Sequence, residues 1–209
     1  MPIPHFPEEN HPLIQPLLHH SDRELLTLFQ DHPEQGKYFS AIFCRYSPMV
    51  YTSIANSARS PREVDCLFAL SWRQIFSKLS KLTLDRKGNS ELHSLQNWLI
   101  YMTAICINQT QLTESIHHDL KAAPPPLCCY LERALDQLPP IIRFIVVMSE
   151  HFHWSLTRIT AYLQAEGEML SLAEVQNLLE QGTNILQENL PEDIRTIYLR
   201  EADSAQSFS

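Results

Sequence analysis

Cysteine and histidine are the residues of this chain whose chemistry could bind a metal or carry a redox reaction. The five cysteines are odd in number, and none stands in a C-x-x-C spacing. We therefore expect free, buried thiols in the reducing cytoplasm. The ten histidines include the pairs His19–His20 and His117–His118 and the triplet His151-Phe152-His153. Adjacent residues point to different sides of a helix, so we expect no metal site and no cofactor. The cysteines are Cys44, Cys66, Cys106, Cys128 and Cys129.

Several classes of protein are disfavoured by what the sequence lacks. It has no glycine-rich phosphate loop, no nucleophile elbow, no H-E-x-x-H and no recognisable pair of carboxylates, so we expect no enzymatic activity. No apolar run reaches the roughly 18 residues of a membrane span. The first 20 residues have neither the basic nor the apolar region of a secretory signal. We therefore expect a cytoplasmic protein without a membrane partner.

Amide side chains in one stretch near the C-terminus could read DNA. Residues 170–187, LSLAEVQNLLEQGTNILQ, carry Ser171 near their start and keep apolar residues at helical spacing, but contain no Lys or Arg. Gln176 and Asn177 are residue types that pair with adenine in the major groove. Two interpretations stay open: a plain amphipathic helix that closes a small core, or a DNA reader without the cations that contact phosphates.

Charge is distributed unevenly along the chain. Residues 37–87 hold nine basic and three acidic residues, whereas the rest holds seven basic and 21 acidic residues, which together give the net charge of −8. The basic segment is either a solvated face or a surface for an acidic partner or nucleic acid. From Leu127 onward five basic residues stand against 12 acidic ones. Such an acidic half is a poor electrostatic match for a phosphate backbone.

Apolar residues at three- and four-residue spacing predict helices along most of the chain. Ser21 and Glu24 form a capping-box pattern, and Ser60 followed by Pro61 marks another helix start. Pro48 predicts a kink or a join between two helices. The helices are expected at 24 to about 32, 37–57, 61–79, 92–116, 127–138, 141–151, 156–164 and 170–187.

We predict an all-α chain of two small helical domains joined by a proline-rich linker. The segment HHDLKAAPPP marks the boundary, because consecutive prolines stiffen an extended connector. The predicted parts are a disordered leader over 1–20, a first domain over 21–116, the linker over 117–126, a second domain over 127–190 and a tail over 191–209.

The order of these parts resembles that of extracytoplasmic-function (ECF) sigma factors, the bacterial subunits that direct RNA polymerase to promoters. Three segments carry the resemblance. Arg45–Tyr51 is similar to R-Y-x-P-x-V-Y of the family, Ala134–Arg143 to A-L-x-x-L-P-x-x-x-R, and Trp154–Leu163 to L-S-x-x-E-I-A-x-x-L. The resemblance covers roughly residues 21–190. It implies a region-2-like helical bundle followed by a region-4-like helix-turn-helix domain.

The recognition helix of the family corresponds to residues 170–186, and its basic positions are replaced here. Gln176, Leu178, Gln181 and Thr183 stand where the family has Lys or Arg. The start of the promoter-melting helix of the family corresponds to Trp98 and the residue after it. The resemblance thus implies DNA contacts from two helices, and the candidate residues are Trp98, Asn108, Ser171, Gln176, Asn177 and Gln181.

The polymerase-docking motif of the family, D-L-V-Q-E, corresponds to Cys66–Leu70, in which Asp, Gln and Glu are replaced by apolar residues or a thiol. This segment is either buried core or an exposed patch for a protein partner, since its apolar residues span more than one helical face. The candidate polymerase- or partner-binding residues are Cys66, Leu67, Phe68, Leu70 and Arg73.

Two functional hypotheses follow from the resemblance and its departures. The first is a sigma-factor-like transcription regulator that binds RNA polymerase core and reads promoter DNA through base contacts. The alternative is a sigma mimic, a protein-interaction module that binds an anti-sigma factor or another regulator without binding promoters.

Overall fold

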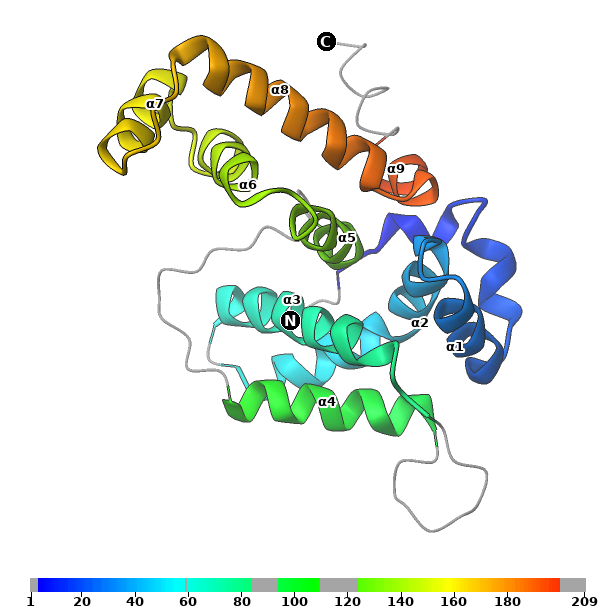
Figure 1. Ribbon diagram of the computed structural model, residues 1–209. Helices are drawn as coiled ribbons and strands as arrows, with labels where there is room; N and C mark the ends of the chain where they lie inside the picture. The colour runs from blue at the N-terminus through cyan, green and yellow to red at the C-terminus, as the bar shows by residue number, and fades with distance from the viewer. Residues whose placement is uncertain (1–3, 59, 84–93, 110–123, 200–209) are drawn as a thin grey trace, which may run out of the picture. The chain divides into compact units, whose positions relative to one another are not determined.

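The computed structural model describes residues 4–58, 60–83, 94–109 and 124–199 (Figure 1). Over these ranges the regular structure is entirely helical, which confirms the all-α prediction. Within them, no helix is long and apolar enough to cross a membrane. The elements are η1 (Pro7–Asn10), η2 (Gln15–His19), α1 (Asp22–Asp31), α2 (Gly36–Ala55), α3 (Pro61–Leu79), α4 (Leu95–Gln109), α5 (Pro125–Leu135), α6 (Pro140–Val146), the π-helical turn η3 (Val147–His151), α7 (Leu156–Ala165), α8 (Leu172–Asn189) and α9 (Glu192–Tyr198).

The described chain divides into two compact units. The first holds the residues up to Cys129 together with Pro191–Leu199, and the second holds Tyr130–Leu190. The chain therefore leaves the first unit within α5 and returns to it at Pro191. Of the linker expected over 117–126, residues 117–123 lie outside the described residues, and α5 already begins at Pro125.

α2 is the central helix of the first unit and packs against α1, α3 and α4. Of its 20 residues, 13 are buried. Its core side is aromatic: the Phe43 ring lies 5.0 Å from that of Trp72, and the Phe39 ring lies 5.9 Å from the same indole, both edge to face. Such pairs contribute roughly 0.5–1.5 kcal/mol each beyond their buried area. The helix continues through Pro48, where a kink or a join was expected.

Residues 4–20, expected as part of a disordered leader, are instead folded onto the first unit. Phe6 stacks at 5.7 Å on Phe68 and meets Phe43 edge to face at 5.1 Å. Ile14 and Leu17 are buried as well. The frequent prolines open the 3-10 helices η1 and η2 rather than preventing order, because proline is pre-set for a first helical turn. Burial of these apolar side chains is the reason that the expectation fails.

One arginine fixes the end of this leader. The Arg45 guanidinium of α2 donates to Asp22 Oδ1 at 2.8 Å and to the carbonyl oxygens of Leu18 at 2.8 Å and His20 at 2.6 Å. The Tyr46 hydroxyl donates to the other Asp22 oxygen. Burial and the bond to Asp22 raise the pKa of Tyr46. The Arg-Tyr pair of the R-Y-x-P-x-V-Y segment thus holds the leader and the start of α1 against α2.

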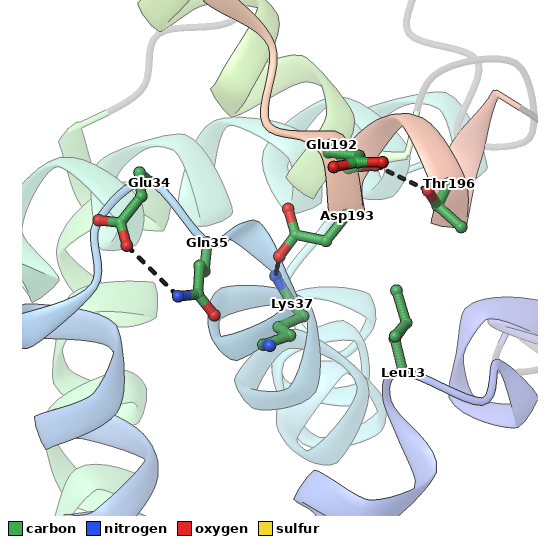
Figure 2. Close-up of a pocket in the computed structure, with 7 residues that line it drawn as sticks. All are labelled: Leu13, Glu34, Gln35, Lys37, Glu192, Asp193 and Thr196. Atoms are coloured by element: carbon green, nitrogen blue, oxygen red, sulfur yellow. Dashed lines mark hydrogen bonds between the residues drawn. The ribbon is translucent and has the colours of Figure 1, made fainter.

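Residues 191–198, assigned from the sequence to the C-terminal tail, include α9, which packs on α2. Asp193 Oδ1 accepts a hydrogen bond from the backbone N–H of Gly36 at 3.1 Å, and Oδ2 accepts one from the N–H of Lys37 at 2.9 Å (Figure 2). Gln35, the N-cap residue of α2, makes no capping bond with its own side chain. Asp193 therefore caps α2 from a segment that lies far away in sequence.

A second contact anchors the end of α9. The Tyr198 hydroxyl donates to Ser40 Oγ at 3.2 Å. Burial, followed by the negative charge of Glu8, raises the pKa of Tyr198 well above its ordinary value. The phenol therefore stays neutral and keeps its proton for Ser40 throughout the physiological range of pH.

The Asp193 cap can be tested by substitution. Asp193→Ala should lower the free energy of unfolding by about 1–2 kcal/mol, the cost of losing a helix cap, because two N–H groups at the start of α2 lose their acceptor. Glu192→Ala, at the exposed neighbouring position, is the matched control and should change it by no more than about 0.5 kcal/mol. Urea unfolding followed by circular dichroism measures both, and equal effects would contradict the cap.

Candidate functional site

The second unit is built on α6, α7 and α8, which pack around a small apolar core (Figure 1). Ser155 caps α7, its Oγ accepting from the N–H of Arg158 at 3.3 Å. Ser171 caps α8 in the same way from Glu174 N–H at 3.3 Å. The buried residues of the core are Ile145, Ile159, Leu163 and Val175.

Ser171 and Glu174 form a complete capping box. The Ser171 N–H and hydroxyl both donate to Glu174 Oε2, at 2.7 Å each. These backbone and side-chain bonds lower the pKa of Glu174. The Ser171 side chain, a candidate DNA contact from the sequence, is thus engaged in starting α8.

Gly182 sets how closely α8 approaches α6, and sequence reasoning missed it. A Cβ at this position would lie 2.5 Å from Ile142 Cγ2 and 2.6 Å from Val146 Cγ2. Both atoms are methyl groups of β-branched side chains, which have little freedom to move away. Glycine in a helix interior is unfavourable by about 1 kcal/mol relative to alanine, so its presence there was the available signal of close packing.

The exposed side of α8 is polar and acidic. Its sequence contains three glutamates and no Lys or Arg. Gln176, Asn177 and Gln181, predicted to contact DNA, are all exposed, and the Gln176 amide donates to Glu180 Oε1 at 3.3 Å. The exposed side chains from the second turn onward are Gln176, Asn177, Glu180, Gln181, Asn184, Gln187, Glu188 and Asn189.

The two other candidate DNA contacts lie on α4, in the first unit. Trp98 is only 7% exposed and forms part of the core, so its ring is not available to stack on a base. Asn108 is exposed. The structure thus leaves Asn108 as the accessible member of this pair.

The segment expected to meet a polymerase or another partner is largely core. Cys66, Leu67 and Phe68 of α3 are each at most 3% exposed, because they pack between α3 and the helices on either side of it. Leu70 is half-buried, and Arg73 is exposed. Of the two interpretations, the structure therefore supports buried core. Among the five candidate residues, a partner could reach only Leu70 and Arg73 without unfolding α3.

The cysteines are free thiols, and four of the five are buried. Burial raises the pKa of Cys44, with a further contribution from Glu8, and burial also raises the pKa of Cys66. A raised pKa disfavours the thiolate that nucleophilic and metal chemistry need. In the part of the chain that the structure describes, no three His, Cys, Asp or Glu side chains come together as metal ligands.

An open cavity of about 450 Å³ lies in the first unit, beside the contact between α9 and α2 (Figure 2). Its acidic groups are partly committed, since Asp193 caps α2 and Glu34 Oε1 accepts from Gln35 at 3.4 Å. It is lined by Leu13, Glu34, Gln35, Lys37, Glu192, Asp193 and Thr196. The cavity brings together none of the residues that the sequence marked for function.

Comparisons of the chain with models of protein families, with curated proteins and with solved structures found no match.

Replacing a helix-interior glycine with alanine usually stabilises a protein, but the close approach of α8 to α6 at Gly182 predicts the opposite. Gly182→Ala should destabilise the chain by about 1–2 kcal/mol, because overpacking against Ile142 and Val146 outweighs the gain in helix propensity. Asn184→Ala, on the exposed side of the same helix, should instead stabilise it by a few tenths of a kcal/mol. Thermal unfolding compares the two variants, and a stabilised Gly182→Ala would contradict the close packing.

The capping box is tested through the titration of one carboxyl group. Ser171→Ala should raise the pKa of Glu174 part of the way to its ordinary value, because the hydroxyl is lost while the backbone N–H donor remains. Because the pKa of Glu174 is lower in the folded than in the unfolded chain, this carboxylate stabilises the fold at pH values above its pKa in the unfolded chain. The deficit of the variant should therefore be present at neutral pH and shrink as the pH falls through the pKa of Glu174. Carboxyl NMR titration measures this, with Ser155→Ala as a control that leaves Glu174 unchanged.

Proposed function

We propose that the chain is a sigma mimic in transcription control, a protein-interaction module that binds an anti-sigma factor or another regulator and does not hold promoter DNA with α8. The resemblance of three sequence segments to ECF sigma factors supports the transcriptional role. The observation that carries the rest is the exposed side of α8, which presents three glutamates and no cation where a recognition helix needs phosphate contacts. This is the sigma-mimic hypothesis.

Electrostatics of the whole second unit support the same proposal. Tyr130–Leu190 contains three arginines against eight acidic residues. Arg143 pairs with Asp136 at 2.7 Å, and Arg158 lies over the Trp154 ring at 3.9 Å. Phosphate contacts supply most of the affinity of nonspecific DNA binding and position the reader on the duplex. A unit with this charge balance would repel a duplex rather than attract it.

The partners that the resemblance implies are RNA polymerase core and an anti-sigma-like regulator. In this proposal the first unit is the region-2-like bundle, and α7 and α8 are the two helices of a region-4-like helix-turn-helix. The capped starts of both helices and the fixed approach of α8 to α6 support that assignment. Because Cys66, Leu67 and Phe68 are core, a partner on α3 would use Leu70 and Arg73.

A second candidate function is a working sigma factor that reads bases without phosphate contacts. The observation in its favour is that Gln176, Asn177 and Gln181 are exposed together on α8, since amides of this kind pair with adenine edges. It would depend on polymerase for affinity. The two candidates differ in whether the complex with polymerase starts transcripts at a defined promoter.

Charge restoration on α8 tests the proposal directly. The full chain should show no measurable binding to labelled duplex DNA at physiological salt. The variant Gln176→Lys/Gln181→Arg/Asn184→Lys should bind, with a slope of log affinity against log salt near −3, about −0.9 for each new phosphate contact. The uncharged control is Gln176→Ala/Gln181→Ala/Asn184→Ala, which should show no measurable binding to the duplex. Submicromolar binding by the unmodified chain would reject the proposal.

Polymerase itself separates the two candidates. The chain is mixed with core RNA polymerase and a promoter library, and complex formation and transcript starts are measured. The proposal expects no promoter-specific transcript. A stable complex that initiates at one promoter would establish the second candidate instead.

A further inference from the structure

The turn that joins α7 to α8 exposes two large apolar side chains close together. Met169 is 90% exposed and Leu172, the first residue of α8, is 48% exposed. Scattered exposed apolar residues are ordinary on protein surfaces. Two within four residues, in a turn that also carries two exposed glutamates, Glu166 and Glu168, form an apolar patch with an acidic rim. We name Glu166–Leu172 the acidic turn.

Hydrogen bonds to two backbone carbonyl oxygens order this turn. Glu168 N–H donates to the Leu163 carbonyl at 2.9 Å, and the Gln164 side chain donates to the Leu170 carbonyl at 2.8 Å. Gly167 has φ +95°, a backbone conformation that glycine adopts without strain. Leu170 packs against the core of the unit, while Met169 beside it points outward. The exposure of Met169 is therefore imposed by an ordered turn.

The charge around the patch is of one sign. Among the described residues, neither Glu166 nor Glu168 has a salt bridge or a side-chain hydrogen bond. Arg158 of α7 lies over Trp154 instead. The eight acidic residues of the unit against three arginines add to the same field. A partner that buries Met169 and Leu172 must bring cations to this rim.

We propose that the acidic turn is a docking surface for a basic amphipathic helix of a partner protein. Met169 and Leu172 would pack against its apolar side, and Glu166 and Glu168 would meet its Lys or Arg residues. Nucleic acid and anionic lipid are repelled by the glutamates, and a second copy of the unit would bring the same charges against them. The inference rests on the proposed function only in taking the partner to be a protein.

The test uses the full chain and a defined probe. The probe is a fluorescein-labelled amphipathic helix of Leu and Lys, about 18 residues or five turns long. Fluorescence anisotropy at physiological salt should give a dissociation constant of about 10–100 μM, since the patch is small. Met169→Ser/Leu172→Ser should weaken binding about tenfold, because both apolar anchors are lost. Glu166→Gln/Glu168→Gln should weaken it severalfold and flatten its salt dependence.

Two controls make the result specific to the turn. Phe152→Ser removes another exposed apolar side chain of the same unit, 55% exposed, and should leave binding within about twofold of the original. The same peptide with Glu in place of Lys should not bind. No binding of the Lys peptide, equal loss from Phe152→Ser, or equal binding of the Glu peptide would each overturn the inference. None of these outcomes changes the duplex or polymerase measurements, which test the proposed function separately.

Discussion

The burial of α2 is the constraint on which the first unit depends. With 13 of its 20 residues buried, α2 cannot rely on water to accept hydrogen bonds from its first N–H groups. The side chain of Gln35 does not accept from them either. Asp193 does so from α9. Arg45 is likewise half-buried in α2, and it is satisfied by Asp22 and by carbonyl oxygens at the end of the leader. Both ends of the described chain therefore contribute polar partners to α2, and the leader adds the apolar side chains that it buries on the first unit.

This dependence explains which parts of the fold the sequence could predict. Helix starts are local: Ser21 with Glu24 and Ser60 before Pro61 are each recognised within four residues, and both serines are caps in the structure. The partner of the first N–H groups of α2 lies more than 150 residues away, at Asp193. No residue spacing in the sequence predicts this pairing of Asp193 with the start of α2. The ordered leader and α9 were missed for the same reason.

The same distinction between local signals and long-range contacts applies to the candidate site. The absence of cations from α8 is a property of the sequence alone, and it needed no structure to be found. Which side of a helix is covered depends on neighbours, so Cys66, Leu67 and Phe68 could be read either as a patch or as core until α2 and α4 were placed beside them. Met169 gave no signal at all, because its exposure follows from the hydrogen bonds of the turn around it.

The two sides of α8 are physically independent, and this has a consequence for function. On one side Gly182, Val175 and the half-buried leucines fix the helix against α6 and α7. On the other side, the exposed amides and glutamates that follow the capping box of α8 make no contact that the packing requires, so replacing acidic by basic side chains there leaves the core intact. The charge of this exposed side can thus differ between acidic and basic with little change in stability. The function of this unit is therefore to be sought in its charged surface, while its core establishes only how the surface is held.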